Sequence, residues 1–115
     1  MSRSPGRSDS EGVSLDRVFR CLSNPTRRRI LTTIADCESL EDAEFEVRDF
    51  VPRNVPPGRF RLKLYHRDLP RLRAAKLVSW DPDSGTITPG PNFRDVEPLI
   101  SLLGANQELL PDRWP

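Results

Sequence analysis

Basic residues recur at every fourth position in the middle of the chain: Arg59, Lys63, Arg67 and Arg71. In a helix this spacing places them along one side, where like charges repel unless a partner neutralises them. Guanidinium groups bind phosphate through paired hydrogen bonds, and they read the guanine edge in the major groove of duplex DNA. The stretch from Arg53 to Lys76 holds eight basic residues against one acidic residue, Asp68, a net charge of +7. This pattern predicts a surface that binds a polyanion.

A second basic cluster, Arg27-Arg28-Arg29, falls in the first turns of another predicted helix. Cations there oppose the helix dipole, so we expect either a phosphate or a neighbouring carboxylate beside them, with a solvated face as the alternative. Arg27 and Arg28 are candidates for contacts with flanking phosphates. Arg67 is the best candidate for reading guanine, and Arg61 and His66 are secondary. The full candidate DNA-binding set is Arg59, Arg61, Lys63, His66, Arg67, Arg71, Arg27 and Arg28.

Residues that would support catalysis or metal binding are scarce. The chain has one histidine and two cysteines, Cys21 and Cys37, without metal-ligand spacing, and it has no glycine-rich phosphate loop. The stretch from Asp36 to Asp49 contains seven acidic residues and one basic residue, Arg48, so its net charge is −6. We expect the acidic residues to form a solvent-facing loop. We therefore expect no enzyme, no cofactor and no metal site. We interpret the cysteines as structural thiols in a reducing cytoplasm, the alternatives being a redox pair or a metal site.

Helices are predicted around both basic clusters. Ser14 caps a first helix of about two turns, and Asn24-Pro25 restarts a second that runs to about Ala35. A short strand at 45–47 and one helical turn within 48–54 follow. The basic helix is expected over 59–75, with an apolar stripe at Leu62, Tyr65, Leu69 and Leu72. Pro70 removes a backbone donor and should kink this helix near residue 66.

The rest of the chain predicts a hairpin and a last helix. Residues 77–80 and 86–88 are β-prone and flank a turn at 81–85. Apolar residues then recur at helical spacing from Phe93 until Gly104, which should end the helix. We expect a disordered arm over 1–13, one domain over 14–104 and a tail over 105–115. No apolar run reaches the length of a membrane helix, so we expect a cytoplasmic protein that contacts no membrane.

This order of elements is that of a winged helix-turn-helix, mainly α with a small β-hairpin wing, in the α+β class. The segments 22–31 (LSNPTRRRIL) and 68–78 (DLPRLRAAKLV) resemble arsenic-repressor (ArsR)-type winged-helix regulators. The stretch LYHRDLPRLRAAKLVSWD is most similar to a group of small haloarchaeal winged-helix proteins. The resemblance spans about residues 15–88, and it implies a cytoplasmic transcriptional regulator that is usually dimeric.

Three departures limit what the resemblance implies. Metal-sensing members carry a cysteine pair near the recognition region, or histidine and acidic ligands on the terminal helix, and this chain has neither. Asp81 and Asp83 stand at the tip of the wing, where DNA-binding wings carry basic residues, so we expect the wing to contribute little. Pro70 replaces a polar residue and alters how the helix would enter the groove.

Two functions are consistent with the sequence. In the first, a homodimer formed through the terminal helices binds double-stranded DNA through the basic helix and regulates transcription. In the second, a winged helix that has lost DNA binding serves as a protein–protein interaction module, and the +7 segment docks on the −6 segment of another copy. The acidic wing and the near-zero net charge of +1 favour the second.

Overall fold

Two short helices open the described part of the computed structural model, which comprises residues 12–111 and 113–115. Helix α1 spans Leu15–Leu22, and the Ser14 side chain accepts a hydrogen bond from the Arg17 N–H. Helix α2 spans Pro25–Ala35, and the Asn24 side chain accepts from the N–H groups of Thr26 and Arg27. Both predicted caps are confirmed. Of the arm predicted over residues 1–13, residues 1–11 lie outside the described part of the chain.

The connection after α2 is short and irregular. It contains the 3₁₀ turn η1 (Leu40–Asp42), the two-residue strand β1 (Phe45–Glu46) and the 3₁₀ turn η2 (Val47–Phe50). Asp49 accepts a hydrogen bond from the Glu46 N–H at 2.8 Å and so caps η2. The predicted strand and helical turn are therefore present, although the turn is 3₁₀ and begins one residue earlier than predicted.

The predicted basic helix is one helical run over residues 57–74 with an interruption in the middle. Helix α3 (Pro57–Lys63) leads into a π-turn, η3 (Leu64–Asp68), and then into α4 (Leu69–Ala74). The Leu69 N–H donates to the Leu64 carbonyl, five residues back. Because Pro70 has no N–H, it cannot close the regular bond to residue 66, and the π-turn lies where that bond is missing. The missing backbone bond predicted from Pro70 is thus confirmed, and the helix accommodates it with a π-turn where the sequence predicted a kink. We call residues 57–74 the basic helix below.

One member of the predicted apolar stripe does not belong to the core. Leu69 and Leu72 are fully buried and Tyr65 is half-buried, but Leu62 is 60% exposed. The expectation for Leu62 is wrong because α3 turns the half-buried Phe60 towards the core, and Leu62 lies about 200° away from Phe60 around the helix. Leu64, at the start of the π-turn, is the first residue of the basic helix that enters the core, with 1% exposure.

The β-hairpin follows the basic helix directly and forms a three-stranded antiparallel sheet. Strands β2 (Val78–Asp81) and β3 (Thr86–Pro89) pair with Trp80 opposite Ile87, and β1 adds to the other side of β3 with Phe45 opposite Ile87. The strand order is β1-β3-β2. Gly85 adopts φ +78° in the turn, a conformation that suits glycine.

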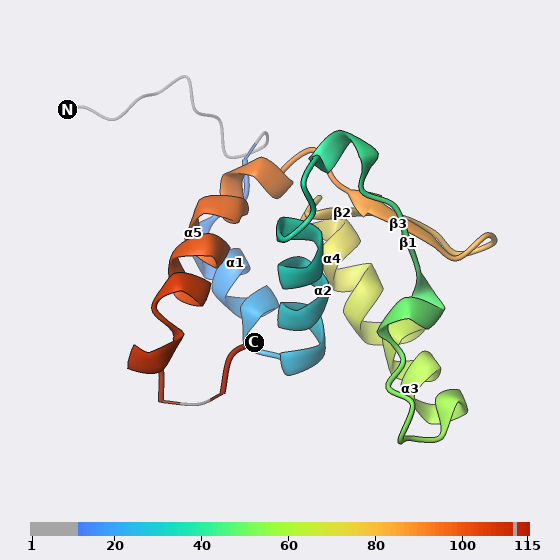
Figure 1. Cartoon of the computed structure of the whole chain (residues 1–115). Helices are drawn as coiled ribbons and strands as arrows, with labels where there is room; N and C mark the ends of the chain where they lie inside the picture. The colour runs from blue at the N-terminus through green and yellow to red at the C-terminus, as the bar shows by residue number, and fades with distance from the viewer. Residues whose placement is uncertain (1–11, 112) are drawn as a thin grey trace.

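The last helix, α5 (Phe93–Ala105), runs one residue past its predicted end at Gly104. It packs against α2, which lies at the centre of the molecule, and α1 packs on α2 as well (Figure 1). The tail predicted over 105–115 contains the 3₁₀ turn η4 (Gln107–Leu109), and Trp114 packs back on the core. The predicted α+β class is confirmed. Within the described residues, no helix is both long enough and apolar enough to cross a membrane.

Candidate nucleic-acid interface

The N-terminal part of the basic helix presents cations to solvent. The exposed members of the predicted set on α3 and the π-turn are Arg59, Arg61, Lys63 and His66. Among residues 12–111 and 113–115, none of these side chains forms an ion pair with an acidic residue. Leu62 is exposed between them, three residues after Arg59 and four before His66. The cations Arg59, Arg61 and Lys63, with the imidazole of His66 on the same helical run, are therefore available to a ligand that carries several negative charges.

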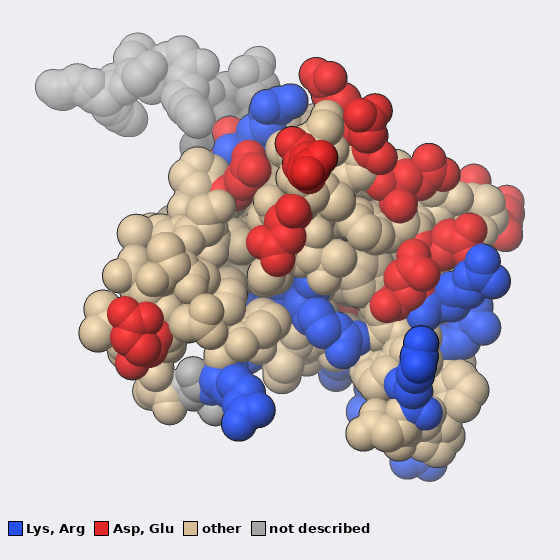
Figure 2. Space-filling model, viewed as in Figure 1, with Lys and Arg blue, Asp and Glu red and all other residues tan. Residues whose placement is uncertain are grey.

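Charge is separated over the surface of the molecule. Figure 2 shows acidic side chains over the region of the hairpin and the loop after α2, and basic side chains below them around α3. Asp81 and Asp83 are exposed at the hairpin turn, where the Asp83 N–H donates to Asp81. The hairpin turn is acidic, as its sequence indicated, and it lies apart from the cations of α3.

Arg67, the candidate for reading guanine, has a partner within the protein. Its Nε donates to Asp68 Oδ1 at 2.9 Å and its Nη2 donates to Asp68 Oδ2 at 3.3 Å. This is the two-pronged contact that the guanidinium would otherwise offer to a phosphate or a guanine. The hydrogen bond to Asp68 raises the pKa of Arg67. Its side chain is 41% exposed, so it still reaches the surface.

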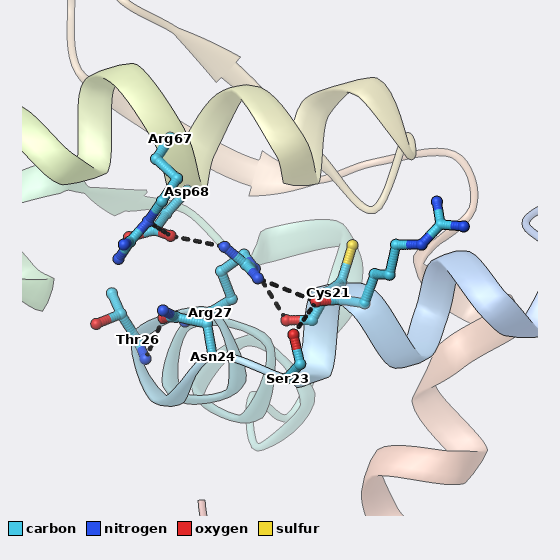
Figure 3. A network of polar contacts seen from close by, with 8 residues as sticks. Cys21, Ser23, Asn24, Thr26, Arg27, Arg67 and Asp68 are labelled. Carbon is cyan, nitrogen blue, oxygen red and sulfur yellow. Dashed lines mark hydrogen bonds and ion pairs between the residues drawn. The ribbon is translucent and has the colours of Figure 1, made fainter.

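Arg27 does not belong to the interface, which corrects the expectation that it reaches phosphate. Its side chain is 6% exposed, and Nη1 donates to Asp68 Oδ1 at 2.9 Å. Its Nε donates to the Cys21 carbonyl and its Nη2 to the Arg20 carbonyl, both at 3.0 Å. Figure 3 shows this guanidinium between the end of α1 and the basic helix. A neighbouring carboxylate, one of the two anions expected beside the cluster, is therefore the partner of Arg27.

The other two arginines of that cluster, Arg28 and Arg29, also donate hydrogen bonds to backbone carbonyl groups. Arg28 Nη1 donates to the Leu22 carbonyl at 2.6 Å and so caps the end of α1. Arg29 Nη2 donates to the Phe50 carbonyl, and its guanidinium lies 5.9 Å from the centre of the Phe60 ring. Arg28 also lines an apolar groove with Phe19, Leu103 and Trp114, between α1, α5 and the C-terminal segment. It therefore lies with the terminal helices, and the structure does not bring it together with the cations of α3.

Two basic residues that the sequence did not single out face the basic helix from α1. Arg17 and Arg20 lie three residues apart and line one side of a groove, and Arg71 and His66 line it from the other side with Arg67. The i, i+3 spacing of Arg17 and Arg20 is visible in the sequence. That α1 lies beside the basic helix is not, because the Arg27 contacts that join the two helices link residues 6 and 41 positions apart.

Aromatic contacts fix the hairpin on the basic helix. The Arg73 guanidinium lies 4.9 Å from the centre of the Trp80 ring, and Nη1 donates to the Trp80 carbonyl at 3.4 Å. Tyr65 meets Trp80 edge to face, with ring centres 5.3 Å apart. The π-turn therefore contacts α2 through Asp68, which pairs with Arg27, and β2 through Tyr65, which meets Trp80.

The cysteines are free and differ in burial. Cys21 is buried, and burial raises the pKa of its thiol, while the charges of Arg27, Arg17 and Arg71 act in the opposite direction. Cys37 is half-buried, with its thiol near the Thr33 carbonyl. In the part of the chain that the structure describes, no three His, Cys, Asp or Glu side chains gather where they could hold a metal ion.

Comparison with known proteins gives no match for this chain, either to a protein-family model, to a curated protein or to a solved structure.

Proposed function

We propose that this protein is a cytoplasmic transcriptional regulator of the winged helix-turn-helix type, and that it binds double-stranded DNA through the basic helix. The observation that carries the proposal is the row of exposed cations on α3, Arg59, Arg61 and Lys63, which have no acidic partner among the described residues. Three cations on so short a stretch repel one another, and a polyanion removes that cost.

The arrangement of elements supports the same reading. A helix that buries only one side is followed at once by a hairpin, and Tyr65 and Arg73 of that helix contact Trp80 in the first strand of the hairpin. In winged-helix proteins one helix enters the major groove while the wing lies near the flanking backbone. In this protein the helix would supply most of the contacts, because the exposed residues Asp81 and Asp83 would repel phosphate.

The geometry divides the roles of the side chains. Arg59, Lys63 and Arg61 would contact phosphate or guanine, since their guanidinium and ammonium groups have no internal partner among the described residues. Leu62 is exposed beside them and would contact a thymine methyl group. Arg67 would contribute less than the sequence suggests, because Asp68 occupies its paired donors.

Exposed apolar residues on the terminal helices support a homodimer. Leu15 and Phe19 on α1 are 62% and 52% exposed, and Leu102 on α5 is 60% exposed. The two helices are adjacent, since Phe19 and Leu103 line the same groove. A second copy that packs on this face would place two basic helices on one DNA duplex, as dimeric regulators require.

The test is fluorescence anisotropy of a labelled mixed-sequence duplex at several salt concentrations. Arg59→Gln and Lys63→Gln should each lower the affinity several-fold and reduce the slope of log K against log salt by about 1, because each removes one phosphate contact. The matched control is Arg94→Gln, which removes one exposed charge from α5. Absence of binding by the unaltered protein even at low salt would refute the proposal.

The acidic hairpin favours a second candidate, a protein–protein interaction module. In that case the basic helix would dock on an acidic surface of another copy. The double variant Arg59→Glu with Lys63→Glu separates the two functions. Loss of DNA binding with an unchanged oligomer supports the regulator, whereas an altered oligomer without a DNA effect supports the module.

A further inference from the structure

A groove between α1 and the C-terminal half of the basic helix lies beside the α3 cations proposed to bind DNA, and none of Arg59, Arg61 and Lys63 lines it. Its volume is about 310 Å³, which is at the lower end of the range of about 300–1,000 Å³ that small-molecule sites occupy. The residues that line it are Arg17, Arg20, Cys21, His66, Arg67, Pro70, Arg71 and Ala74. It is therefore large enough for a small ligand and is lined mostly by basic side chains.

The charge of this groove comes from two facing helices. Arg17 and Arg20 project from α1, and Arg71 projects from α4. Within the described residues these three side chains form no ion pair, and no acidic residue is among those that line the groove. Arg17 and Arg71 stand on different helices, α1 and α4, and both line the groove together with Cys21.

Asp68, the carboxylate that follows Arg67 in the chain, is already occupied. Asp68 is 1% exposed, and it accepts hydrogen bonds from Arg27 and from two nitrogen atoms of Arg67, Nε and Nη2. Its charge is shared between these two guanidinium groups and is not directed at Arg17, Arg20 or Arg71. Among the described residues no carboxylate lines the groove, so it gathers positive charge, at a cost that a bound anion removes.

We propose that this groove binds a small anion that carries phosphate, with the guanidinium groups of Arg17, Arg20 and Arg71 as its ligands. Guanidinium groups donate paired hydrogen bonds to phosphate oxygens, and three of them around one concave space suit an anion with more than one negative charge. Pro70, Ala74 and the Cys21 thiol supply an apolar side, which fits the organic part of a phosphate ester.

The groove is set in place before any ligand arrives. Arg27 donates to the carbonyls of Arg20 and Cys21 at the end of α1 and to Asp68 on the basic helix, so one buried side chain fixes the separation of the two walls. A preorganised site loses little conformational entropy when it binds a ligand. The site is small and concave, so a free anion fits it better than the backbone of a duplex.

The first experiment measures the binding of pyrophosphate by calorimetry at constant ionic strength. The double variant Arg17→Gln with Arg20→Gln should bind pyrophosphate about tenfold or more weakly, because two charge-assisted contacts are lost. The matched control, Arg59→Gln with Lys63→Gln, removes the same charge from α3 and should stay within about twofold of the unaltered protein. Equal weakening by both double variants, or no binding of pyrophosphate by the unaltered protein, would overturn the proposal.

A second measurement uses no variant and therefore does not depend on variant folding. Cys21 lines the groove, so pyrophosphate should slow its alkylation by the neutral reagent iodoacetamide, whereas Cys37, which lies after α2, should react at an unchanged rate. Mass spectrometry distinguishes the two thiols. An unchanged rate at Cys21 under saturating pyrophosphate would count against the site.

The DNA duplex is the other source of phosphate, and the same variants test it. For a free anion, the Arg17→Gln and Arg20→Gln pair should leave DNA affinity within about threefold, while the α3 pair loses about tenfold or more. If the α1 pair instead weakens DNA binding as much as the α3 pair, and pyrophosphate does not protect Cys21, the groove receives DNA phosphate and the proposal fails. Because the pyrophosphate measurements contain no DNA, they stand even if the proposed DNA binding does not.

Discussion

Arg27 and Asp68 are 41 residues apart in the chain and form an ion pair with an N–O distance of 2.9 Å and almost no solvent exposure. The pair joins α2 to the π-turn of the basic helix, and two further donors of Arg27 hold the end of α1. A buried charge must be paired and fully hydrogen-bonded to be tolerated, and this one is. The position of the basic helix relative to α1 and α2 therefore depends on these two side chains.

Loss of Asp68 should destabilise the fold strongly. Asp68→Ala leaves the Arg27 guanidinium buried without its carboxylate, and we expect the free energy of unfolding to fall by about 3 kcal/mol or more. Arg67→Gln breaks the other ion pair of the same carboxylate, but its side chain is 41% exposed, so we expect a loss of less than about 1 kcal/mol. Urea denaturation measures both. A loss for Arg67→Gln as large as that for Asp68→Ala would contradict this account.

Gly90 should not tolerate a side chain. A Cβ at this position would lie 2.4 Å from the Lys76 carbonyl oxygen, a backbone atom that is itself tied to the Asn92 N–H. We expect Gly90→Ala to lower the free energy of unfolding by about 2 kcal/mol, because the backbone at residue 90 and the backbone at Lys76 must move apart. The control is Gly58→Ala in α3, where nothing lies within 4 Å, and there we expect a small gain of about 0.5 kcal/mol from helix propensity. Thermal unfolding of the two variants should shift in opposite directions.

Cys21 should react slowly and depend on pH in a defined way. Burial raises the pKa of its thiol, so its thiolate is scarcer at neutral pH than that of an ordinary cysteine and grows only as pH rises towards the raised value. The same shift contributes stability that is complete below the ordinary pKa of a thiol and is lost as pH rises through the raised one. Alkylation followed by mass spectrometry should modify Cys37 first at neutral pH. Faster modification of Cys21 would show that the arginines outweigh burial.

The proposed dimer face can be tested by a charge. Phe19 is 52% exposed, so Phe19→Glu should change the stability of a monomer by no more than about 0.5 kcal/mol. In a dimer that packs through α1 and α5, the same change buries a carboxylate and should abolish association. Analytical ultracentrifugation measures the mass in solution. Leu62→Glu, an equally apolar and exposed position on α3, is the control and should leave the dimer intact.

Local signals in the sequence predicted most elements of the fold. Ser14, and Asn24 followed by Pro25, define helix starts through contacts within three residues, and the turn at 81–85 separates two β-prone runs. Pro70 lacks an N–H, and so the interruption of the basic helix could be placed near residue 66. The prediction that Leu62 is buried was wrong, because regular helical spacing takes no account of the π-turn between Leu62 and the buried Leu69.

The sequence alone determined the charge of the basic helix, the elements that flank it and the scarcity of catalytic groups, since these depend on residue type and short-range spacing. Only the tertiary structure decided which cations face solvent. It assigns Arg27 to the interior, engages Arg67 with its neighbour Asp68, and brings Arg17 and Arg20 to the side of Arg71. The physical reason is that an ion pair forms between groups that packing brings within a few ångströms, and no local signal in the sequence marks a contact between residues 41 positions apart.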